Sequence, residues 1–169
     1  DQAVINFACY EDAKDFLGLA SVTLPDVDFI VATISGAGIA GNVEAPIIGH
    51  MNAMITQIKF RTFSVDSLKL LEPREHNIDL RAPQQVYDPI AGVYKTQSVK
   101  HVLVLIPKTL SNGNIAPASP TDGSGSYATR RWVTYIDDAK VMELDPYNYI
   151  FEVNGVDYLS DTRKALGKS

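Results

Sequence analysis

Three glycines at positions 36, 38 and 41 form the one motif in this chain whose spacing is associated with a chemical function. The segment "GAGIAG" is a literal G-x-G-x-x-G, the pattern of loops that bind dinucleotide phosphates. Such a loop needs a strand before it and a helix that begins inside it. The N-terminus of that helix supplies the backbone N–H groups that hold the pyrophosphate.

Only half of that context is present around Gly36, Gly38 and Gly41. Residues 29–34 are good strand formers, but Pro46 and Gly49 would end any helix within two turns. We therefore expect the glycines and the following "EAPIIG" to connect two long strands, with the glycines permitting positive φ or close backbone approach. A nucleotide-binding enzyme that uses this loop stays open as an alternative.

No other set of residues has the spacing of a catalytic or metal site. The three histidines lack a second ligand at metal-binding spacing, and "GSGS" at 123–126 is not the strained elbow of a serine nucleophile. Adjacent residues of a strand point to opposite faces, so Arg130 and Arg131 should each pair with an acid instead of forming one basic patch. We expect no enzyme activity, no metal and no cofactor, and a core position for Trp132.

Charge is unevenly distributed along the chain. The net charge is −5, and residues 1–60 hold seven acids and two bases (7 − 2 = 5), whereas the remaining residues hold equal numbers of each. Because phosphate binding needs clustered Lys and Arg, the acidic first third argues against a surface that grips nucleic acid. The single Cys9 cannot form an internal disulfide and should be a small buried residue.

Alternating apolar residues predict a chain made mostly of strands. Residues 4–34, 51–62 and 94–107 have strand character, and hairpin turns are expected at 88–92, 137–138 and 154–155. One internal helix should begin at a Ser64 cap, pack an apolar stripe on a sheet and stop at Pro73. A last short helix should be capped by Asp161 and ended by Gly167. The stripe comprises Val65, Leu68 and Leu71.

These elements predict one domain over residues 1–169. Its fold should be a mainly antiparallel β sandwich or barrel with one short packed helix and a short C-terminal helix. Residues 109–126 are rich in Asn, Gly, Pro, Ser and Thr, and we expect them to form a flexible loop inside the domain. No apolar run approaches the roughly 20 residues that span a bilayer.

Three segments together resemble a known family, the major tail tube proteins of contractile-tailed phages and contractile bacteriocins. The resemblance covers nearly the whole chain and preserves the order of a V-x-L-P strand, a glycine bend and an E-x-V-N-G-x-D-x-L run followed by an arginine and L-G. The long 109–126 segment departs from the pattern. The matching residues are Val22, Leu24 and Pro25, the glycines from Gly36 to Gly41, then Asn154, Gly155, Asp157, Arg163 and Gly167.

The resemblance implies a structural virion protein. Subunits of this family form six-membered rings that stack into a hollow tube, with strands from all six closing one barrel around the lumen. The implied partners are other copies of the chain and the tail sheath, tape measure and baseplate proteins. The genome passes through without specific binding, and the implied location is the tail tube of a virion assembled in the host cytoplasm.

Asp26 and Asp28 are candidate lumen residues. If residues 26–31 are a strand whose apolar face, Val27, Phe29 and Val31, packs on the subunit's own core, both carboxylates point to the other side. Six copies would then place twelve carboxylates (2 × 6) around a channel, where they would repel DNA phosphates over about 8 Å. A monomeric β-sandwich binding module is the remaining alternative.

Overall fold

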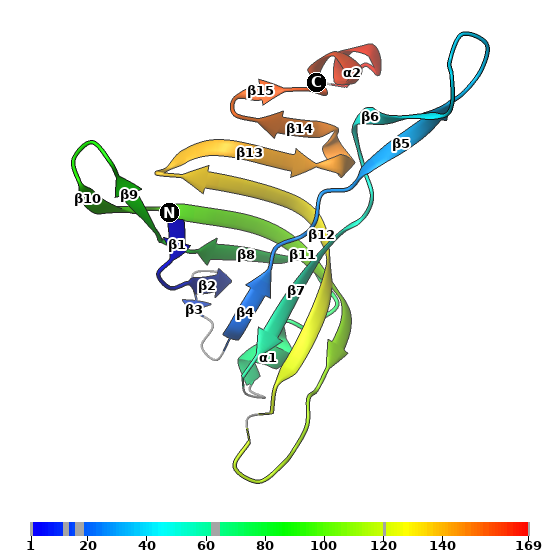
Figure 1. Cartoon of the computed structure of the whole chain (residues 1–169). Helices are drawn as coiled ribbons and strands as arrows, with labels where there is room; N and C mark the ends of the chain where they lie inside the picture. Colours follow the sequence, from blue (N-terminus) through cyan, green and yellow to red (C-terminus); the bar gives the residue numbers. More distant parts are fainter. Residues whose placement is uncertain (1, 12–13, 16–18, 62–64, 120, 169) are drawn as a thin grey trace.

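A long, strongly curved antiparallel sheet dominates the structure, which is a computed structural model that describes residues 2–11, 14–15, 19–61, 65–119 and 121–168. The strand order is β15-β14-β13-β12-β11-β8-β2-β3 (Figure 1). These strands are β2 Ala8–Glu11, β3 Lys14–Asp15, β8 His76–Arg81, β11 Val99–Ser111, β12 Gly123–Ile136, β13 Ala139–Asp145, β14 Ile150–Val153 and β15 Val156–Asp157.

The two longest strands, β11 and β12, each change neighbours halfway along. The C-terminal half of β12 pairs with β13, and its N-terminal half pairs with β7 (Met54–Phe60), which in turn pairs with β4 (Leu19–Thr23). The N-terminal half of β11 pairs with β8 only as far as Leu105. The lower part of the molecule is therefore a four-stranded section in the order β4-β7-β12-β11.

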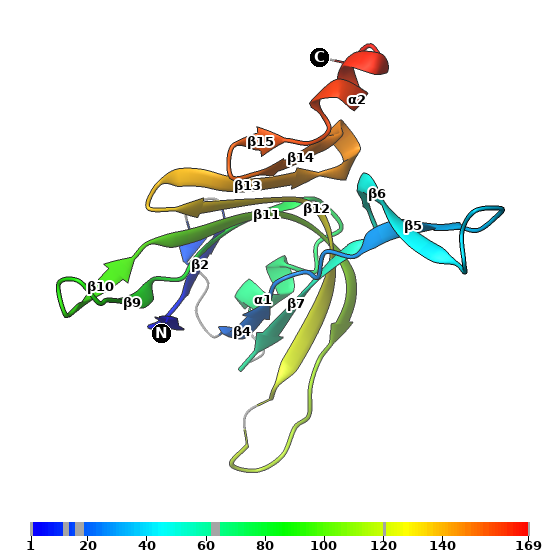
Figure 2. The same cartoon turned by 45° about the horizontal axis from the view of Figure 1, so that its top comes forward.

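Two small sheets project from this body (Figures 1 and 2). One is a ribbon of β5 (Phe29–Ile34) and β6 (Val43–Met51), which pair only with each other among the described residues. The other has the order β1-β9-β10, comprising β1 Gln2–Val4, β9 Gln84–Asp88 and β10 Val93–Gln97. No helix within the described ranges is long and apolar enough to cross a membrane.

The core lies between the curved sheet and the short helix α1 (Val65–Lys69). Leu70, which follows the helix, is fully buried in the cluster formed by β7, β8, β11 and β12. The predicted stripe is wrong, because Val65, Leu68 and Leu71 are all exposed. The five-residue helix is too short to present an apolar stripe, so it packs on the sheet through Leu70, just beyond its C-terminal end. The central members of the cluster are Ile58, Phe60, Ile78, Leu103, Leu105, Tyr127, Trp132 and Leu144.

The structure confirms the mainly antiparallel β fold with two short helices. It also confirms the predicted tight turns at 137–138 and 154–155. Asp137 and Asp138, and then Asn154 and Gly155, have positive φ at both central positions of two-residue loops, as a type I′ turn requires. Cys9 and Trp132 are core residues as predicted. The predicted Ser64 cap lies outside the described residues.

Several boundaries differ from the prediction. "EAPIIG" is part of strand β6 and not of a connection, because a two-stranded ribbon can accommodate Pro46 at an edge. Residues 109–111 pair with 124–126, so the segment between β11 and β12 narrows from 109–126 to 112–122. The last helix, α2 (Ser160–Ala165), has Leu159 at its N-cap, and Asp161 lies inside its first turn.

The end of α2 follows the prediction. Gly167 has φ +71°, its N–H donates to the Lys164 carbonyl at 3.1 Å, and the Lys168 N–H donates to the Arg163 carbonyl at 2.8 Å. These two bonds form a Schellman motif, which satisfies carbonyls that the last helical turn leaves unpaired. A one-turn helix η1 (Pro146–Asn148) connects β13 to β14.

Candidate assembly surfaces

The glycine motif lies at the tip of the β5–β6 ribbon. Gly36, Gly38 and Gly41 have φ of +152°, +91° and +140°, conformations that other residues rarely adopt, and open space surrounds each of them. The chain continues from the loop directly into β6, so no helix N-terminus is available to hold a phosphate. The loop therefore joins two strands, as predicted, and gives the nucleotide-binding alternative no support.

The β5–β6 ribbon, residues 29–51, is called the arm below. It is rich in β-branched apolar side chains that protrude on both faces, and it stands away from the body of the chain (Figure 2). An isolated two-stranded hairpin is marginally stable in water, and a contiguous exposed apolar patch usually marks an interaction site. The exposed members are Phe29, Ile30, Val31, Ile34, Ile39, Val43, Ile47 and Ile48, of which Ile48 is 69% exposed.

The base of the arm packs on the C-terminal segment. A wide bulge in β6 places Gly49 against the buried side chain of Leu159, where an added Cβ would lie 2.5 Å from Cδ2. The ring of Phe29 packs on Phe151 with centroids 5.7 Å apart. Because these contacts join residues far apart in the sequence, the C-terminal segment fixes the base of the arm relative to the body.

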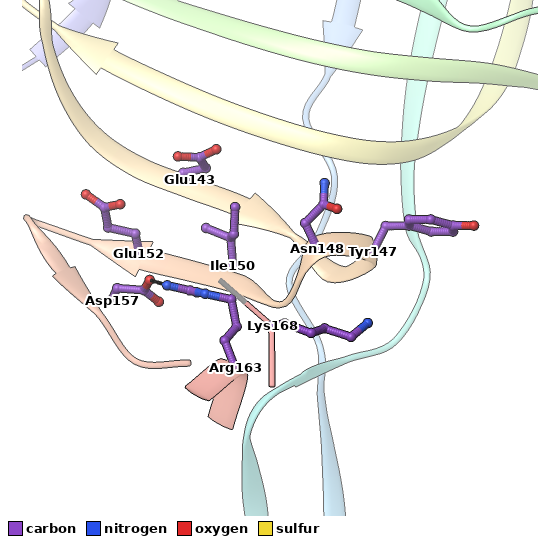
Figure 3. Close-up of a pocket in the computed structure, with 8 residues that line it drawn as sticks. All are labelled: Glu143, Tyr147, Asn148, Ile150, Glu152, Asp157, Arg163 and Lys168. Atoms are coloured by element: carbon purple, nitrogen blue, oxygen red, sulfur yellow. Dashed lines mark hydrogen bonds and ion pairs between the residues drawn. The ribbon is translucent and has the colours of Figure 1, made fainter. Parts of the chain in front are cut away.

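An open pocket of about 510 Å³ lies beside this segment, and the resemblance motif lines part of it (Figure 3). Arg163 reaches from α2 to the Asp157 carboxylate and also donates to the Tyr149 carbonyl at 2.7 Å. Asp157 accepts a further bond from the Leu159 N–H at 3.1 Å. The hydrogen bond from Arg163 holds the pKa of Asp157 below its usual value. The motif thus ties α2 to the β14–β15 hairpin.

The other acids of this pocket are also paired. Burial alone would raise the pKa of Glu143, but hydrogen bonds from Lys140 and Arg131 bring it below its usual value. Lys140 Nζ lies 2.8 Å from Glu143 and 3.3 Å from Glu152. Each carboxylate therefore has a cation beside it and serves to hold strands together, and the lowered pKa of Glu143 is the opposite of the raised pKa that a catalytic general acid needs.

The remaining candidates for chemistry have structural partners. Arg130 lies 2.8 Å from Glu75 and Arg131 2.7 Å from Glu143, so the two arginines pair with separate acids as predicted. His76 is fully buried, with Nδ1 2.6 Å from Glu11 and Nε2 3.0 Å from the Glu72 carbonyl. Over the described part of the chain, no three His, Cys, Asp or Glu side chains gather as metal ligands would.

The V-x-L-P motif ends strand β4 and starts a link to the arm. Val22 and Leu24 pack on the core and Pro25 is buried. Asp26 and Asp28 are exposed, and they line a shallow groove of about 310 Å³ with Thr23, Ile55 and Gln57. The prediction that they alternate along a strand is wrong, because residues 24–28 belong to no strand of the described structure, and of the expected apolar face only Val27 packs on the core. Phe29 and Val31 are 43% and 45% exposed.

Two strand edges of the four-stranded section are open among the described residues. One is the outer edge of β4, and the other is the outer edge of β11 from Ile106 to Ser111, beyond its pairing with β8. All three pairings inside the section are antiparallel, so β4 and β11 run in opposite directions. Proteins rarely leave such edges uncovered, because an open edge is a template for pairing with another chain.

Sequence reasoning missed both the open β11 edge and the arm. A signal for the arm was present, since "FIVATI" is apolar at odd and even positions, which is typical of strands covered on both faces. The β11 edge had no sequence signal, because it depends on how far β8 extends alongside β11.

Comparisons with solved structures show which proteins have a similar fold. Two solved structures share the fold, and both are titled as the extracellular contractile injection system PVC in its extended state. A chain of its sheath/tube terminator aligns with a TM-score of 0.56 at 10% identity, covering 79% of this chain and 95% of the other. A chain of its sheath-tube complex aligns with a TM-score of 0.57 at 11% identity, covering 79% and 90%.

The family assignment comes from the sequence itself. The family model for phage tail tube protein FII matches residues 1–167, and the chain belongs to that family. In a comparison with curated proteins, no sequence matched significantly. Membership gives the chain a structural role as a component of a tail tube.

Proposed function

We propose that this protein forms six-membered rings that stack into the inner tube of a contractile tail, and that the tube is the conduit for genome delivery. The observation that carries the proposal is the four-stranded section with two open edges of opposite direction. Rotation about an axis along the sheet brings β11 of one subunit beside β4 of the next in antiparallel orientation. Such a head-to-tail contact closes into a ring and leaves no edge free.

The size of the resulting barrel suits a nucleic-acid channel. Four strands from each of six subunits make 24 (4 × 6), which at about 4.8 Å per strand and a tilt of about 40° give a backbone diameter of about 48 Å. Inward side chains take about 5 Å on each side, half the spacing of packed sheets, which leaves a bore of about 38 Å. A hydrated DNA duplex fits within that width.

The arm provides a second contact surface between copies of the chain. Its apolar faces lack cover within the described chain and would be buried against a neighbouring copy in the ring or in the next ring. The proposed further partners are the sheath, the tape measure and the baseplate, in a virion tail assembled in the host cytoplasm. The solved PVC sheath-tube complex that shares the fold supports the sheath in particular. The role is mechanical and needs no enzyme activity.

A pair of isoleucine variants tests the proposal. Ile48→Lys places a charge on the arm, and Ile115→Lys places the same charge on the 112–122 segment, where Ile115 is 99% exposed against 69% for Ile48. We expect both variants to fold with unchanged circular dichroism, and we expect only Ile48→Lys to lose assembly in sedimentation velocity, because a buried unpaired charge is costly. If Ile48→Lys assembles as well as the unmodified chain, the arm is not an assembly surface.

A further inference from the structure

A buried cluster of charged and polar side chains lies where strand β8 begins. Glu11, the last residue of β2, is 5% exposed, and Nδ1 of the fully buried His76 lies 2.6 Å from its Oε1. Arg74 Nη1 lies 3.0 Å from the same oxygen. These three residues, called the clamp below, come from β2, from β8 and from the segment 72–75 between α1 and β8.

The clamp fixes the path of the chain through residues 72–75. The Glu72 carbonyl accepts from His76 Nε2 at 3.0 Å and from the Arg74 N–H at 2.8 Å, which folds the segment back on itself. Since a carbonyl oxygen only accepts, Nε2 must carry a proton, and a second proton must lie between Nδ1 and the Glu11 carboxylate. The segment is therefore held at the side chain of Arg74 and at the backbone of Glu72.

Burial of such a cluster adds little to stability by itself. Taking a carboxylate out of water costs several kcal/mol, and apolar residues of similar volume often give equal or greater stability. A fully paired cluster provides a defined geometry instead, because each bond fixes the distance and direction of its partner. The position of the clamp in the fold indicates what that geometry does.

The clamp lies at the point where the open edge of β11 begins. His76, the first residue of β8, pairs with Leu105 of β11, and the open edge starts at the next residue, Ile106. If β8 continued in the same antiparallel register, Glu75 would lie beside Ile106 and the residues before it would cover more of the edge. The clamp instead holds Arg74 against β2, and the strand ends at His76.

We infer that Glu11, His76 and Arg74 are positioning residues of the contact between subunits: they end β8 at His76 and keep the β11 edge open for β4 of the next subunit. This inference rests on the proposed ring. In an antiparallel contact the C-terminal end of that β4 lies nearest the clamp, because β11 runs away from it. A segment 72–75 that was free to move along the edge would compete with the neighbour for the same backbone groups.

A matched pair of arginine variants tests the inference. Arg74 and Arg131 each pair with a buried glutamate, Arg74 with Glu11 at 3.0 Å and Arg131 with Glu143 at 2.7 Å, and the two arginine side chains are 44% and 36% exposed. Only the first pair holds the segment before β8, whereas the second joins β12 to β13. We expect Arg74→Ala and Arg131→Ala to lose similar free energy of unfolding in urea. Only Arg74→Ala should need a protein concentration at least about tenfold higher for half-assembly in sedimentation velocity.

Two variants of Glu11 test whether the geometry of the clamp is what matters. Glu11→Gln keeps an oxygen that accepts from Arg74 and adds an N–H that donates to His76 Nδ1, whereas Glu11→Leu removes both bonds. At equal concentrations of folded subunit, assembly should be near normal in Glu11→Gln and reduced in Glu11→Leu. In free subunits, hydrogen exchange at the Arg74 N–H, which donates to the Glu72 carbonyl, should become faster in Glu11→Leu and Arg74→Ala but not in Glu11→Gln.

The possible failures are distinguishable. If Arg74→Ala assembles as readily as Arg131→Ala, or if Glu11→Gln loses assembly as Glu11→Leu does, the clamp does not position the edge. The unmodified chain still forms rings in both cases, so the proposed function stands and only this inference fails. If the unmodified chain forms no rings, the proposed function fails and the inference with it. If Glu11→Leu does not fold, the two arginine variants, which leave the buried side chains unchanged, still decide the question.

Discussion

The contact between Gly49 and Leu159 gives a quantitative test of how the C-terminal segment holds the arm. Gly49 has φ +71° and its absent Cβ would lie 2.5–2.7 Å from three side-chain carbons of Leu159, which is itself buried. Gly92 has nearly the same conformation, φ +67°, but nothing lies within 4 Å of its Cβ position. The two glycines therefore differ in packing and hardly at all in backbone geometry.

Replacing each glycine by alanine separates the free-energy cost of the left-handed backbone from that of the packing clash. A left-handed conformation costs a residue with a Cβ about 1–2 kcal/mol, so Gly92→Ala should lower the free energy of unfolding by that amount. Gly49→Ala carries the same cost, and forcing a methyl group into a packed site adds about 1–3 kcal/mol. We therefore expect Gly49→Ala to lower the free energy of unfolding by about 1–3 kcal/mol more than Gly92→Ala does.

Urea unfolding measures both variants, with Trp132 as the fluorescent probe in the core and with protein dilute enough to stay unassembled. Adding Leu159→Ala to Gly49→Ala should remove the clash, so the double variant should lose less stability than the sum of the single changes. Equal losses for Gly49→Ala and Gly92→Ala, or strict additivity in the double variant, would refute the contact. Gly49→Ala should also reduce assembly, because it displaces the base of the arm.

Four further predictions concern single features of the molecule. The Arg163 hydrogen bond lowers the pKa of Asp157 in the folded state, so its contribution to stability is present above the unfolded value near 3.8 and is lost as pH falls through the folded pKa. Asp157→Asn should therefore show a smaller loss of unfolding free energy between pH 7 and pH 3 than the unmodified chain, and an equal loss would contradict the pairing. Tyr127 has a buried hydroxyl with no hydrogen-bond partner among the described residues, and burial raises its pKa to about 12. Tyr127→Phe should leave the urea midpoint unchanged or raise stability by about 1 kcal/mol, whereas a marked loss would reveal a missed partner. Asp26→Lys with Asp28→Lys should change subunit stability by no more than about 0.5 kcal/mol and make tubes retain DNA, and normal release of DNA would argue against a channel position for the two carboxylates. Replacing residues 115–120 by a Gly-Ser tip should preserve the fold seen by circular dichroism, since loop closure changes by about 0.6 kcal/mol per doubling of length, and an unfolded product would place this segment in the core.

Local chemistry made some parts of this fold predictable. The turns at Asp137–Asp138 and Asn154–Gly155, and the helix end at Gly167, depend on which residues tolerate positive φ, and that preference is a property of the residues themselves. Strands β7 and β8 could be predicted equally well, because their apolar and polar residues alternate as one buried and one exposed face require.

Other parts depend on partners distant in the sequence, and the sequence pattern could not show them. The buried leucine at α1 is Leu70, just after the helix, and not a member of the predicted stripe, because the direction from which the sheet approaches decides which side chain is covered. "EAPIIG" forms a strand only because β5 offers it an antiparallel partner. Asp26 and Asp28 lie in a link between β4 and β5 because β4 ends at Thr23, and they share a groove with Thr23 and Gln57.

Electron microscopy of the purified, concentrated protein tests the central claim most directly. The account predicts hollow six-fold rings or stacked tubes, in which β11 residues 106–111 of each subunit pair with β4 of the next and the bore is about 38 Å wide, as the strand count and spacing require. Particles of single subunits at every concentration, or rings that leave the β4 and β11 edges unpaired, would contradict it.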